Sequence, residues 1–248
     1  MKQICLISLI TIFFWRGVLA SEPPLDSEWV SEEFIDYKID QDVTQQMPSY
    51  KERRASTGAL FSLSYSQFEP LDYQPSSVNE TYEELYSDLA DGLYEFTASY
   101  KWNFAMGSMS LGLGVGMFQA LSDINVVDST LTVVPVRLEA TFAFDNLFSE
   151  PKIVPYGLAG IYTMYYKEVQ AATTYSGTTQ ASYYFGGGAL FQIDWFFEEQ
   201  AFESYLENGQ ENTFLYIEGR KFVASDLIPN DPNFETDFLI GGGFKFEY

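Results

Sequence analysis

The feature that most constrains this sequence is a repeated alternation of apolar and polar residues with period two. From Leu93 to Phe104, one parity holds only apolar or aromatic residues, and the other parity is polar after Leu93. Successive side chains of a β-strand point to opposite faces, so this segment predicts a strand with one apolar and one polar face. The same clear alternation recurs in Met109–Ala120, Val134–Phe144 and Phe238–Tyr248. An all-β protein is therefore expected.

Four weaker alternating segments complete a predicted set of eight strands: Thr57–Phe68, Ile153–Tyr166, Tyr183–Trp195 and Thr213–Val223. By these boundaries the eight segments are 11 to 14 residues long. Strands in soluble proteins average about 5–6 residues, whereas a tilted strand that crosses a membrane needs about 9–11. The lengths predict strands that span a membrane.

The polar parity distinguishes a membrane barrel from a soluble one. It is rich in glycine, at Gly112, Gly114, Gly116, Gly186, Gly188, Gly241 and Gly243. Small residues fit the crowded interior of a narrow eight-stranded barrel, whereas a face in water would carry more Lys, Glu and Thr. Rings near the ends of the apolar parity, such as Tyr94 and Phe104, are typical of an interfacial aromatic belt. The pattern predicts an eight-stranded antiparallel transmembrane β-barrel whose apolar parity faces lipid.

The lengths of the connections predict how the barrel is oriented. Membrane barrels alternate short periplasmic turns with longer external loops, and the long, acidic connection 69–92 is followed by a tight one at 105–108. The sixth connection, Phe196–Asn212, is long where a short turn is expected. Phe197, Ala201 and Tyr205 recur there at helical spacing, which predicts a short periplasmic helix between strands six and seven. Two further strands, giving ten in all, are the alternative.

The N-terminal residues indicate export. Lys2 precedes an apolar run from Ile4 to Trp15, and Val18-Leu19-Ala20 ends the segment, so residues 1–20 are predicted to be a cleaved signal peptide. Residues 21–56 are acidic and polar and predict a mostly flexible periplasmic segment, while residues 57–248 form the barrel domain. Cys5 is the only cysteine and would leave with the signal peptide, so no disulfide is expected.

Charge and histidine content exclude several functions. The chain has 35 Asp and Glu against 13 Lys and Arg, and nucleic-acid binding needs clustered basic charge. It contains no histidine, which removes every mechanism that uses a histidine base or a histidine-bound metal. We therefore expect no enzymatic activity, no cofactor, no metal site and no nucleic-acid partner.

Eight charged residues fall on the predicted interior parity: Glu95, Lys101, Arg137, Glu139, Glu218, Arg220, Lys245 and Glu247. They could line a polar conduit or small-ligand cavity, or they could form an ion-pair network that neutralises buried charge, because unpaired buried charge is costly. An eight-stranded barrel is only wide enough for its own side chains to fill it, which favours the network.

Two short motifs resemble a known family. Val134-Pro135-Val136-Arg137-Leu138, followed by Val154–Tyr162, resembles the fourth and fifth strands of small bacterial outer-membrane β-barrels of the OmpA-like, OmpX and OmpW types. Phe244, Phe246 and Tyr248 share one face of the last strand and resemble the signal by which the outer-membrane assembly machinery recognises its substrates. The resemblance implies a bacterial outer-membrane location, with membrane lipid, lipopolysaccharide and that machinery as partners, and a monomeric barrel.

With catalysis not expected, the first hypothesis for the function is a structural, envelope or surface-interaction role. The outer-membrane barrel enzymes resemble one another in needing a histidine, which this chain lacks. Two alternatives remain open: a narrow channel for small or hydrophobic solutes, as OmpW-type barrels suggest, and a soluble secreted β-barrel that binds a lipophilic ligand.

Overall fold

Long antiparallel strands dominate the computed structural model, which describes residues 48–74, 82–86, 92–122, 129–170, 173–225 and 232–248. These residues belong to one unit, Gln46–Tyr248. Its strands are β1 (Thr57–Ser66), β2 (Leu93–Phe104), β3 (Gly107–Leu121), β4 (Ser129–Ala143), β5 (Ile153–Gln170), β6 (Thr173–Thr178), β7 (Ser182–Gln192), β8 (Asn212–Phe222) and β9 (Leu239–Glu247). The predicted signal peptide, 1–20, and most of the predicted periplasmic segment, 21–47, lie outside the described residues.

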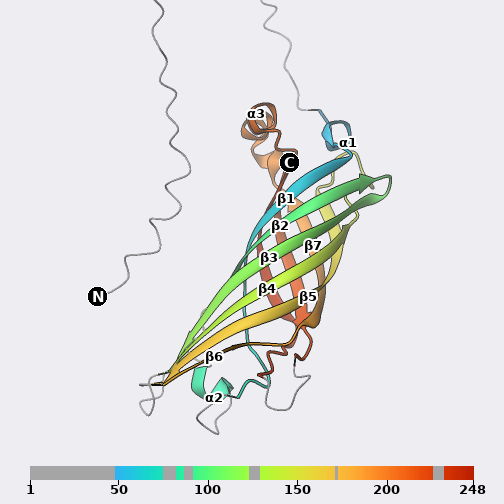
Figure 1. Ribbon diagram of the computed structural model, residues 1–248. Coiled ribbons are helices and arrows are strands. Elements are labelled where there is room, and N and C mark those ends of the chain that lie inside the picture. Colours follow the sequence, from blue (N-terminus) through green and yellow to red (C-terminus); the bar gives the residue numbers. More distant parts are fainter. Residues whose placement is uncertain (1–47, 75–81, 87–91, 123–128, 171–172, 226–231) are drawn as a thin grey trace, which may run out of the picture. The chain divides into compact units, whose positions relative to one another are not determined.

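Eight of these strands close into a barrel (Figure 1). Each strand pairs antiparallel with its neighbours in the order β1, β2, β3, β4, β5, β7, β8, β9, and β9 pairs back onto β1. The closing seam runs from Leu60, opposite Glu247, to Ser66, opposite Gly241. Closure leaves no unpaired barrel edge, which is the requirement for strands surrounded by lipid. The predicted eight-stranded antiparallel barrel is confirmed.

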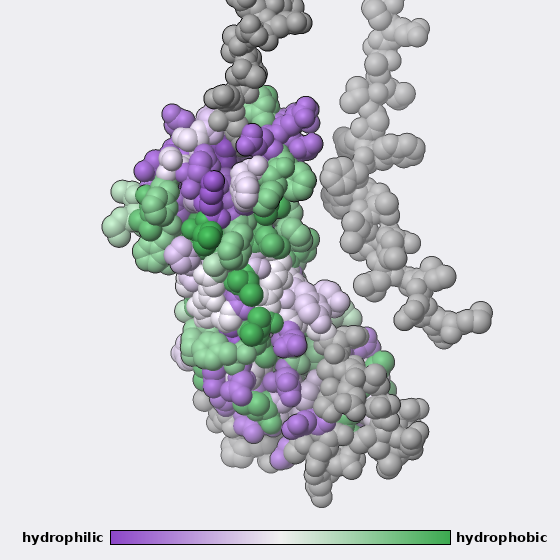
Figure 2. Space-filling model, turned by 180° about the vertical axis from the view of Figure 1, so that it is seen from behind, coloured by the Kyte–Doolittle hydropathy of each residue, from purple (hydrophilic) through white to green (hydrophobic). Residues whose placement is uncertain are grey.

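Side chains alternate between the two faces of the wall as the period-two pattern predicts. On β3, Leu113 is 65% exposed on the outer face, whereas Ser110 and its inward neighbours are buried. Every barrel strand carries at least two exposed large apolar side chains, for example Leu63, Phe96, Leu113, Leu138, Ile161, Phe185, Ile217 and Ile240. On the face seen in Figure 2, hydrophilic side chains lie mostly towards the two ends, with hydrophobic and pale residues between them.

The two ends of the barrel differ in their connections. One end, the turn end, holds α1 (Tyr50–Arg53), the 3-10 helix η2 (Asp194–Phe196) and α3 (Glu198–Asn208); the other, the loop end, holds α2 (Tyr82–Tyr86) and β6 (Figure 1). Helix α3 lies between β7 and β8, the sixth and seventh barrel strands, so the predicted helix is confirmed and the ten-strand alternative is wrong. No helix in the described part of the chain is long and apolar enough to cross a membrane.

The strands at the loop end extend further than the sequence predicts. β4 begins at Ser129 instead of Val134, β5 continues to Gln170 instead of ending at Tyr166, and the segment before the next predicted strand contains β6. Strand β6 pairs with the end of β5, so a ninth strand lies outside the barrel ring. Polar residues such as Thr130, Thr132 and Lys167 occupy the outer face here, which hides the apolar alternation that reveals the other strands.

Candidate functional site

The barrel interior holds all eight charged residues that the sequence places on the inner parity. Six of them are buried, and the side chains of Glu139 and Glu218 are 12% exposed. The set contains four carboxylates and four cations, so its formal charge sums to zero. The structure gathers seven of the eight into two ion-pair clusters and places Lys245 over the rings of Tyr156 and Tyr216, at 4.9 and 5.3 Å from their centroids.

The central cluster is organised around Glu95, which projects inward from β2. Its two carboxylate oxygens pair with two guanidinium groups: Arg137 of β4, at 3.0 Å between Nε and Oε1, and Arg220 of β8, through Nη2. Each arginine also pairs with a glutamate two residues away on its own strand, Arg137 with Glu139 at 3.2 Å and Arg220 with Glu218 at 3.7 Å. The cluster therefore links β2, β4 and β8, no two of which are neighbours in the barrel. Sequence spacing alone does not reveal these contacts.

Tyrosine hydroxyl groups satisfy the outer carboxylates of this central cluster. The Tyr184 hydroxyl donates to Glu139 at 3.0 Å, and the Tyr156 hydroxyl donates to Glu218 at 2.7 Å. The Arg137 guanidinium lies 5.2 Å from the centroid of the Tyr184 ring. Buried charges are tolerated when their remaining hydrogen-bonding groups also find partners, and these tyrosines supply part of that compensation.

Glycine provides the space in which the central cluster lies. A Cβ on Gly114 would stand 2.9 Å from the Thr97 hydroxyl and 3.1 Å from a guanidinium nitrogen of Arg137. A Cβ on Gly116 would stand 2.9 Å from Cγ of Glu95. The inward glycines of β3 thus make room for the long side chains of β2 and β4: Gly116 stands opposite Glu95, and Gly114 opposite Arg137.

A second ion-pair cluster, the turn-end cluster, surrounds the ammonium group of Lys101. Lys101 pairs with Glu247 of β9 and, at 2.9 Å, with Asp145. Its ammonium donates to the Tyr50 hydroxyl at 2.9 Å, and that hydroxyl donates to Glu247 at 3.0 Å. Asp145 also pairs with Arg54 at 2.8 Å. Asp145, Tyr50 and Arg54 were not among the predicted site residues.

Helix α1 closes the turn end over this cluster, although it belongs to the segment predicted to be mostly flexible. Tyr50 is fully buried, and its burial, together with the charges of Glu247 and Asp145, raises the pKa of its hydroxyl well above the ordinary value. Arg53 donates to the Glu211 carbonyl at 2.8 Å and lies 3.9 Å from Asp194. Desolvation raises the pKa of both the Asp194 and the Glu211 carboxyl groups.

The loop end of the interior is filled by an apolar cluster that the sequence reasoning missed. We call it the aromatic cluster; its rings are Phe68, Tyr73, Tyr82, Tyr86, Phe118, Tyr162, Tyr184, Phe222 and Phe234. Phe68 lies 4.9 Å from Phe118 and Tyr73 lies 5.0 Å from Phe234, measured between ring centroids. Tyr73 and Tyr86 donate to the fully buried Glu168 at 3.1 and 3.0 Å. Burial raises the pKa of Tyr73 above its ordinary value.

A usable signal for this aromatic cluster was present in the first connection. Tyr82, Leu85 and Tyr86 stand at helical spacing and form the buried face of α2. From the sequence this connection is described only as long and acidic, because acidic residues stand between these apolar ones. The partner side chains, such as Phe234, come from the opposite end of the sequence, so the contact itself could not be inferred.

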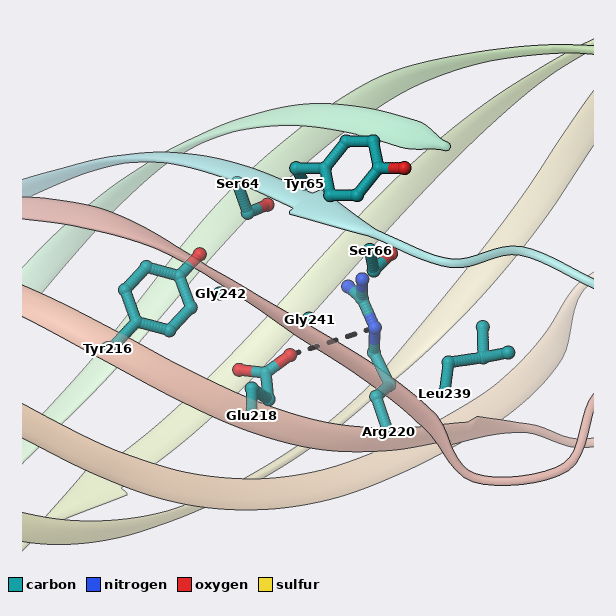
Figure 3. A pocket seen from close by; sticks show the side chains of 9 residues that line it. All are labelled: Ser64, Tyr65, Ser66, Tyr216, Glu218, Arg220, Leu239, Gly241 and Gly242. Atoms are coloured by element: carbon teal, nitrogen blue, oxygen red, sulfur yellow. Dashed lines mark ion pairs between the residues drawn. The ribbon is translucent and has the colours of Figure 1, made fainter. Parts of the chain in front are cut away.

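The space left between the interior side chains is small. One cavity, lined by Ser64, Ser66, Tyr216, Glu218 and Arg220 among others, has a volume of about 10 Å³, and in Figure 3 the Arg220 guanidinium points towards Ser66. A second, beside Lys101, Asp145 and Lys245, has a volume of about 20 Å³. A water molecule needs roughly 10–15 Å³, so each cavity has room for about one.

The residues of the predicted assembly signal lie on the closing strand. Phe244 and Tyr248 are exposed on the outer face, and Phe246 is half-buried. The backbone of Tyr248 exchanges two hydrogen bonds with Ala59 of β1, at 2.7 and 2.9 Å, and its ring lies 5.9 Å from the Phe61 ring. These residues therefore form one end of the seam that closes the barrel.

Comparison with known proteins gives similarity in fold. No protein-family model matches the sequence, and the search of curated proteins gave no match. The structure is similar to that of Ail, the attachment invasion locus protein of Yersinia pestis, at 14% identity and a TM-score of 0.39, covering 77% of this chain and 97% of that one.

Two Pseudomonas aeruginosa structures are similar in the same way. The N-terminal β-barrel domain of OprF has 14% identity and a TM-score of 0.42, covering 78% of this chain and 98% of that one. The outer membrane protein OprG has 11% identity and a TM-score of 0.44, covering 79% and 97%. Sequence identities and TM-scores this low assign no function to this chain. The proposed function must therefore rest on the structure of the barrel.

Proposed function

We propose that this protein is an integral β-barrel of the bacterial outer membrane, with a structural, envelope or surface-interaction role and no catalysis. The observation that carries the proposal is the division of the wall into two faces. Large apolar side chains are exposed on the outside of all eight barrel strands, and paired charges occupy the inside. Lipid is the surroundings in which such an outer face is stable.

The alternative of a soluble barrel that binds a lipophilic ligand requires the opposite arrangement. Such a barrel encloses an apolar cavity and presents polar residues to water. Here Leu113, Ile161 and Ile240 are exposed, whereas Glu95, Lys101 and Arg137 are buried. The outer face would be an apolar surface far larger than soluble monomers tolerate.

The filled interior favours a structural role over conduction. The turn-end cluster, the central cluster and the aromatic cluster follow one another along the barrel, and two cavities among the described interior residues have volumes of about 10 and 20 Å³. We call the band of exposed apolar side chains around the barrel the apolar girdle. Beyond it, the strand extensions of β4 and β5, together with β6, carry polar outer faces. These polar faces are suited to contacts at the cell surface.

The membrane lipid and lipopolysaccharide are the proposed surroundings of the apolar face, and the outer-membrane assembly machinery is the proposed partner during biogenesis. The proposed orientation places the turn end in the periplasm and the loop end outside, because short connections in such barrels lie on the periplasmic side. Export would depend on the predicted signal peptide. We propose that the barrel is monomeric.

Cell fractionation tests this membrane assignment. We expect the full-length protein to remain in the outer-membrane fraction after salt and carbonate washes and to require detergent for extraction. Release of the protein by carbonate would contradict a membrane barrel. Single-channel recording in planar bilayers tests the sealed interior, and steady conductance by the wild-type protein would favour the channel alternative.

The orientation can be tested with single cysteines in a Cys5→Ser background. Ser176 on β6 is exposed at the loop end, and Asn208 is exposed at the end of α3. On intact cells, an impermeant maleimide should label Ser176→Cys and leave Asn208→Cys unlabelled. The reverse result would invert the barrel in the membrane.

A further inference from the structure

The short connections at the turn end carry exposed apolar side chains in places where a solvated turn would be polar. Met106, between β2 and β3, is 60% exposed, and Phe148, between β4 and β5, is 68% exposed. The sixth connection, between β7 and β8, exposes Trp195, Phe196, Phe197 and Leu206. We call these side chains, with Leu147, the turn-end collar. They continue the apolar outer face past the last residues of the strands.

Helix α3 contributes one segment of the turn-end collar. None of its residues is buried. At helical spacing, Phe202, Tyr205 and Leu206 share one face, whereas Glu203 and Glu207 lie towards the other. Phe202 and Tyr205 are half-buried, but Leu206 is 63% exposed. The helix is therefore amphipathic, with an apolar face that the rest of the described chain leaves partly uncovered.

The distribution of the turn-end collar indicates what covers it. A protein partner contacts one patch, but these side chains occur in the β2–β3, β4–β5 and β7–β8 connections, which are spread around the barrel. A bilayer surface meets every connection at one end of a barrel. Trp195 supports the same occupant, because the Lys152 ammonium lies 5.3 Å from its ring centroid. A tryptophan beside a lysine, with an apolar body and a polar tip, suits the lipid headgroup region.

We propose that the turn-end collar is immersed in the headgroup region of the adjacent phospholipid leaflet, and that α3 lies along this leaflet with Leu206 towards the acyl chains. Glu203 and Glu207 then face the aqueous phase. The inference rests on the proposed membrane barrel. It further specifies how deep the turn end lies in the leaflet and that α3 is bound to lipid. Interfacial helices of this kind bury an apolar face to a depth of about 5–10 Å.

Fluorescence quenching in lipid vesicles tests this placement. Full-chain Cys5→Ser protein receives one cysteine, at Leu206, Phe148, Glu207 or Leu113, labelled with an environment-sensitive nitrobenzoxadiazole dye. All four positions are exposed, so the label should be tolerated, and heat-dependent mobility verifies folding. The protein is reconstituted into phosphatidylethanolamine–phosphatidylglycerol vesicles that contain lipids spin-labelled near the headgroup or deep in the acyl chain. Iodide serves as the aqueous quencher.

The proposal predicts that shallow spin labels quench the dye at Leu206→Cys and Phe148→Cys at least about twofold more strongly than the dye at Glu207→Cys. Iodide should quench the dye at Glu207→Cys more strongly than at the other two positions. Leu113→Cys, in the middle of the girdle, should respond most to deep spin labels. If Leu113→Cys is quenched by lipid but Leu206→Cys and Phe148→Cys behave like Glu207→Cys, the lipid-bound collar is wrong and the membrane barrel stands. If Phe148→Cys alone is quenched, α3 faces another partner and its proposed position is wrong. If Leu113→Cys is also unquenched, the membrane barrel fails with it.

Discussion

The central cluster and the aromatic cluster fill the same barrel with opposite chemistry. In the central cluster, Glu95, Arg137 and Arg220 neutralise one another among glycines. In the aromatic cluster, inward positions on neighbouring strands hold Phe118, Leu131 and Val133, and apolar side chains from α2 and the loop residues cover them. One pair of strands, β3 and β4, contributes to both regions.

The two regions differ because the outer face of the strands changes from apolar to polar along their length. Within the apolar girdle the outside is already apolar, so the inside carries the polar groups that pair across a narrow lumen. Beyond the girdle the outer faces of β4 and β5 become polar, and the inside becomes an ordinary hydrophobic core. The same strands thus pass from a membrane-protein pattern to a soluble-protein pattern along their length.

The largest expected effect comes from breaking the central cluster at Glu95. Glu95→Ala leaves Arg137 and Arg220 without the carboxylate that both share. Removing one partner of a buried ion pair costs about 3–5 kcal/mol, so the free energy of unfolding in urea-treated vesicles should fall by that amount. Glu83→Ala, on the exposed side of α2, is the matched control and should change it by less than about 0.5 kcal/mol. If Glu95→Ala lowers the free energy of unfolding as little as Glu83→Ala does, water already solvates the arginines and the central cluster does not stabilise the barrel.

The next effect locates the boundary between the two regions on the outer face of β3. Leu113 and Leu121 are both exposed on this face, eight residues apart. Leu113→Arg should cost about 2–4 kcal/mol, because arginine near the bilayer midplane is expensive, whereas Leu121→Arg should cost only about 0–1 kcal/mol. Refolding yield and unfolding in vesicles measure both. Equal losses of unfolding free energy for the two variants would show that the lipid-facing part of β3 does not end between Leu113 and Leu121.

A smaller effect is expected inside the aromatic cluster. Tyr73→Phe removes one of two tyrosine hydrogen bonds to Glu168 and leaves the ring contacts in place. Hydrogen bonds to charged groups contribute about 1.5–3 kcal/mol, and the bonds that Glu168 keeps from Tyr86 and Gln170 should hold the loss near the lower value. Amide hydrogen exchange should accelerate at the loop end while the central strands keep their protection. Uniform acceleration over all strands would show that the two regions unfold as one.

The smallest effect concerns pH at the turn end. Burial raises the pKa of the Asp194 and Glu211 carboxyls, so the folded protein holds these protons more tightly than the unfolded chain does. Their contribution to stability is fully present below the unfolded pKa values of about 4 and is lost as pH rises through the folded values. Asp194→Asn should flatten this part of the pH dependence of the unfolding free energy. If the pH dependence of the unfolding free energy is unchanged in Asp194→Asn, the Asp194 carboxyl does not cause the loss of stability with rising pH.

The strands could be predicted because their outer parity is apolar wherever lipid is expected. The inner parity likewise identified Glu95, Arg137 and Arg220 as interior residues. Their pairing could not be predicted, since Glu95 and Arg220 stand on β2 and β8 and meet only through the curvature and register of the closed barrel. The β4 extension at Thr130–Thr132 was missed because its outer face is polar.

Helix α1 shows a second limit of sequence reasoning. Tyr50 and Arg54 lie in a polar stretch without periodicity, and their partners, Glu247 and Asp145, are distant in the sequence. Only the assembled turn end brings these four side chains together. Aromatic residues in the first connection, such as Tyr82 and Tyr86, were likewise read with their acidic neighbours instead of by their helical spacing.

Deletion of Phe246–Tyr248 links the fold to biogenesis. These residues supply part of the seam with β1 and the proposed assembly signal. The shortened protein should be exported but should accumulate in the periplasm or be degraded, because an unpaired strand edge is not tolerated in lipid. A soluble barrel should tolerate the loss. Membrane insertion equal to that of the full-length protein would contradict both roles.

The most direct test of the membrane barrel is the electrophoretic mobility of the full-length protein from washed outer membranes, with and without boiling in SDS. The paired and closed strands should resist SDS at room temperature, so we predict a compact band before boiling and a shifted band after it, both from the membrane fraction. One unchanged band, with the protein in the soluble fraction, would contradict the account.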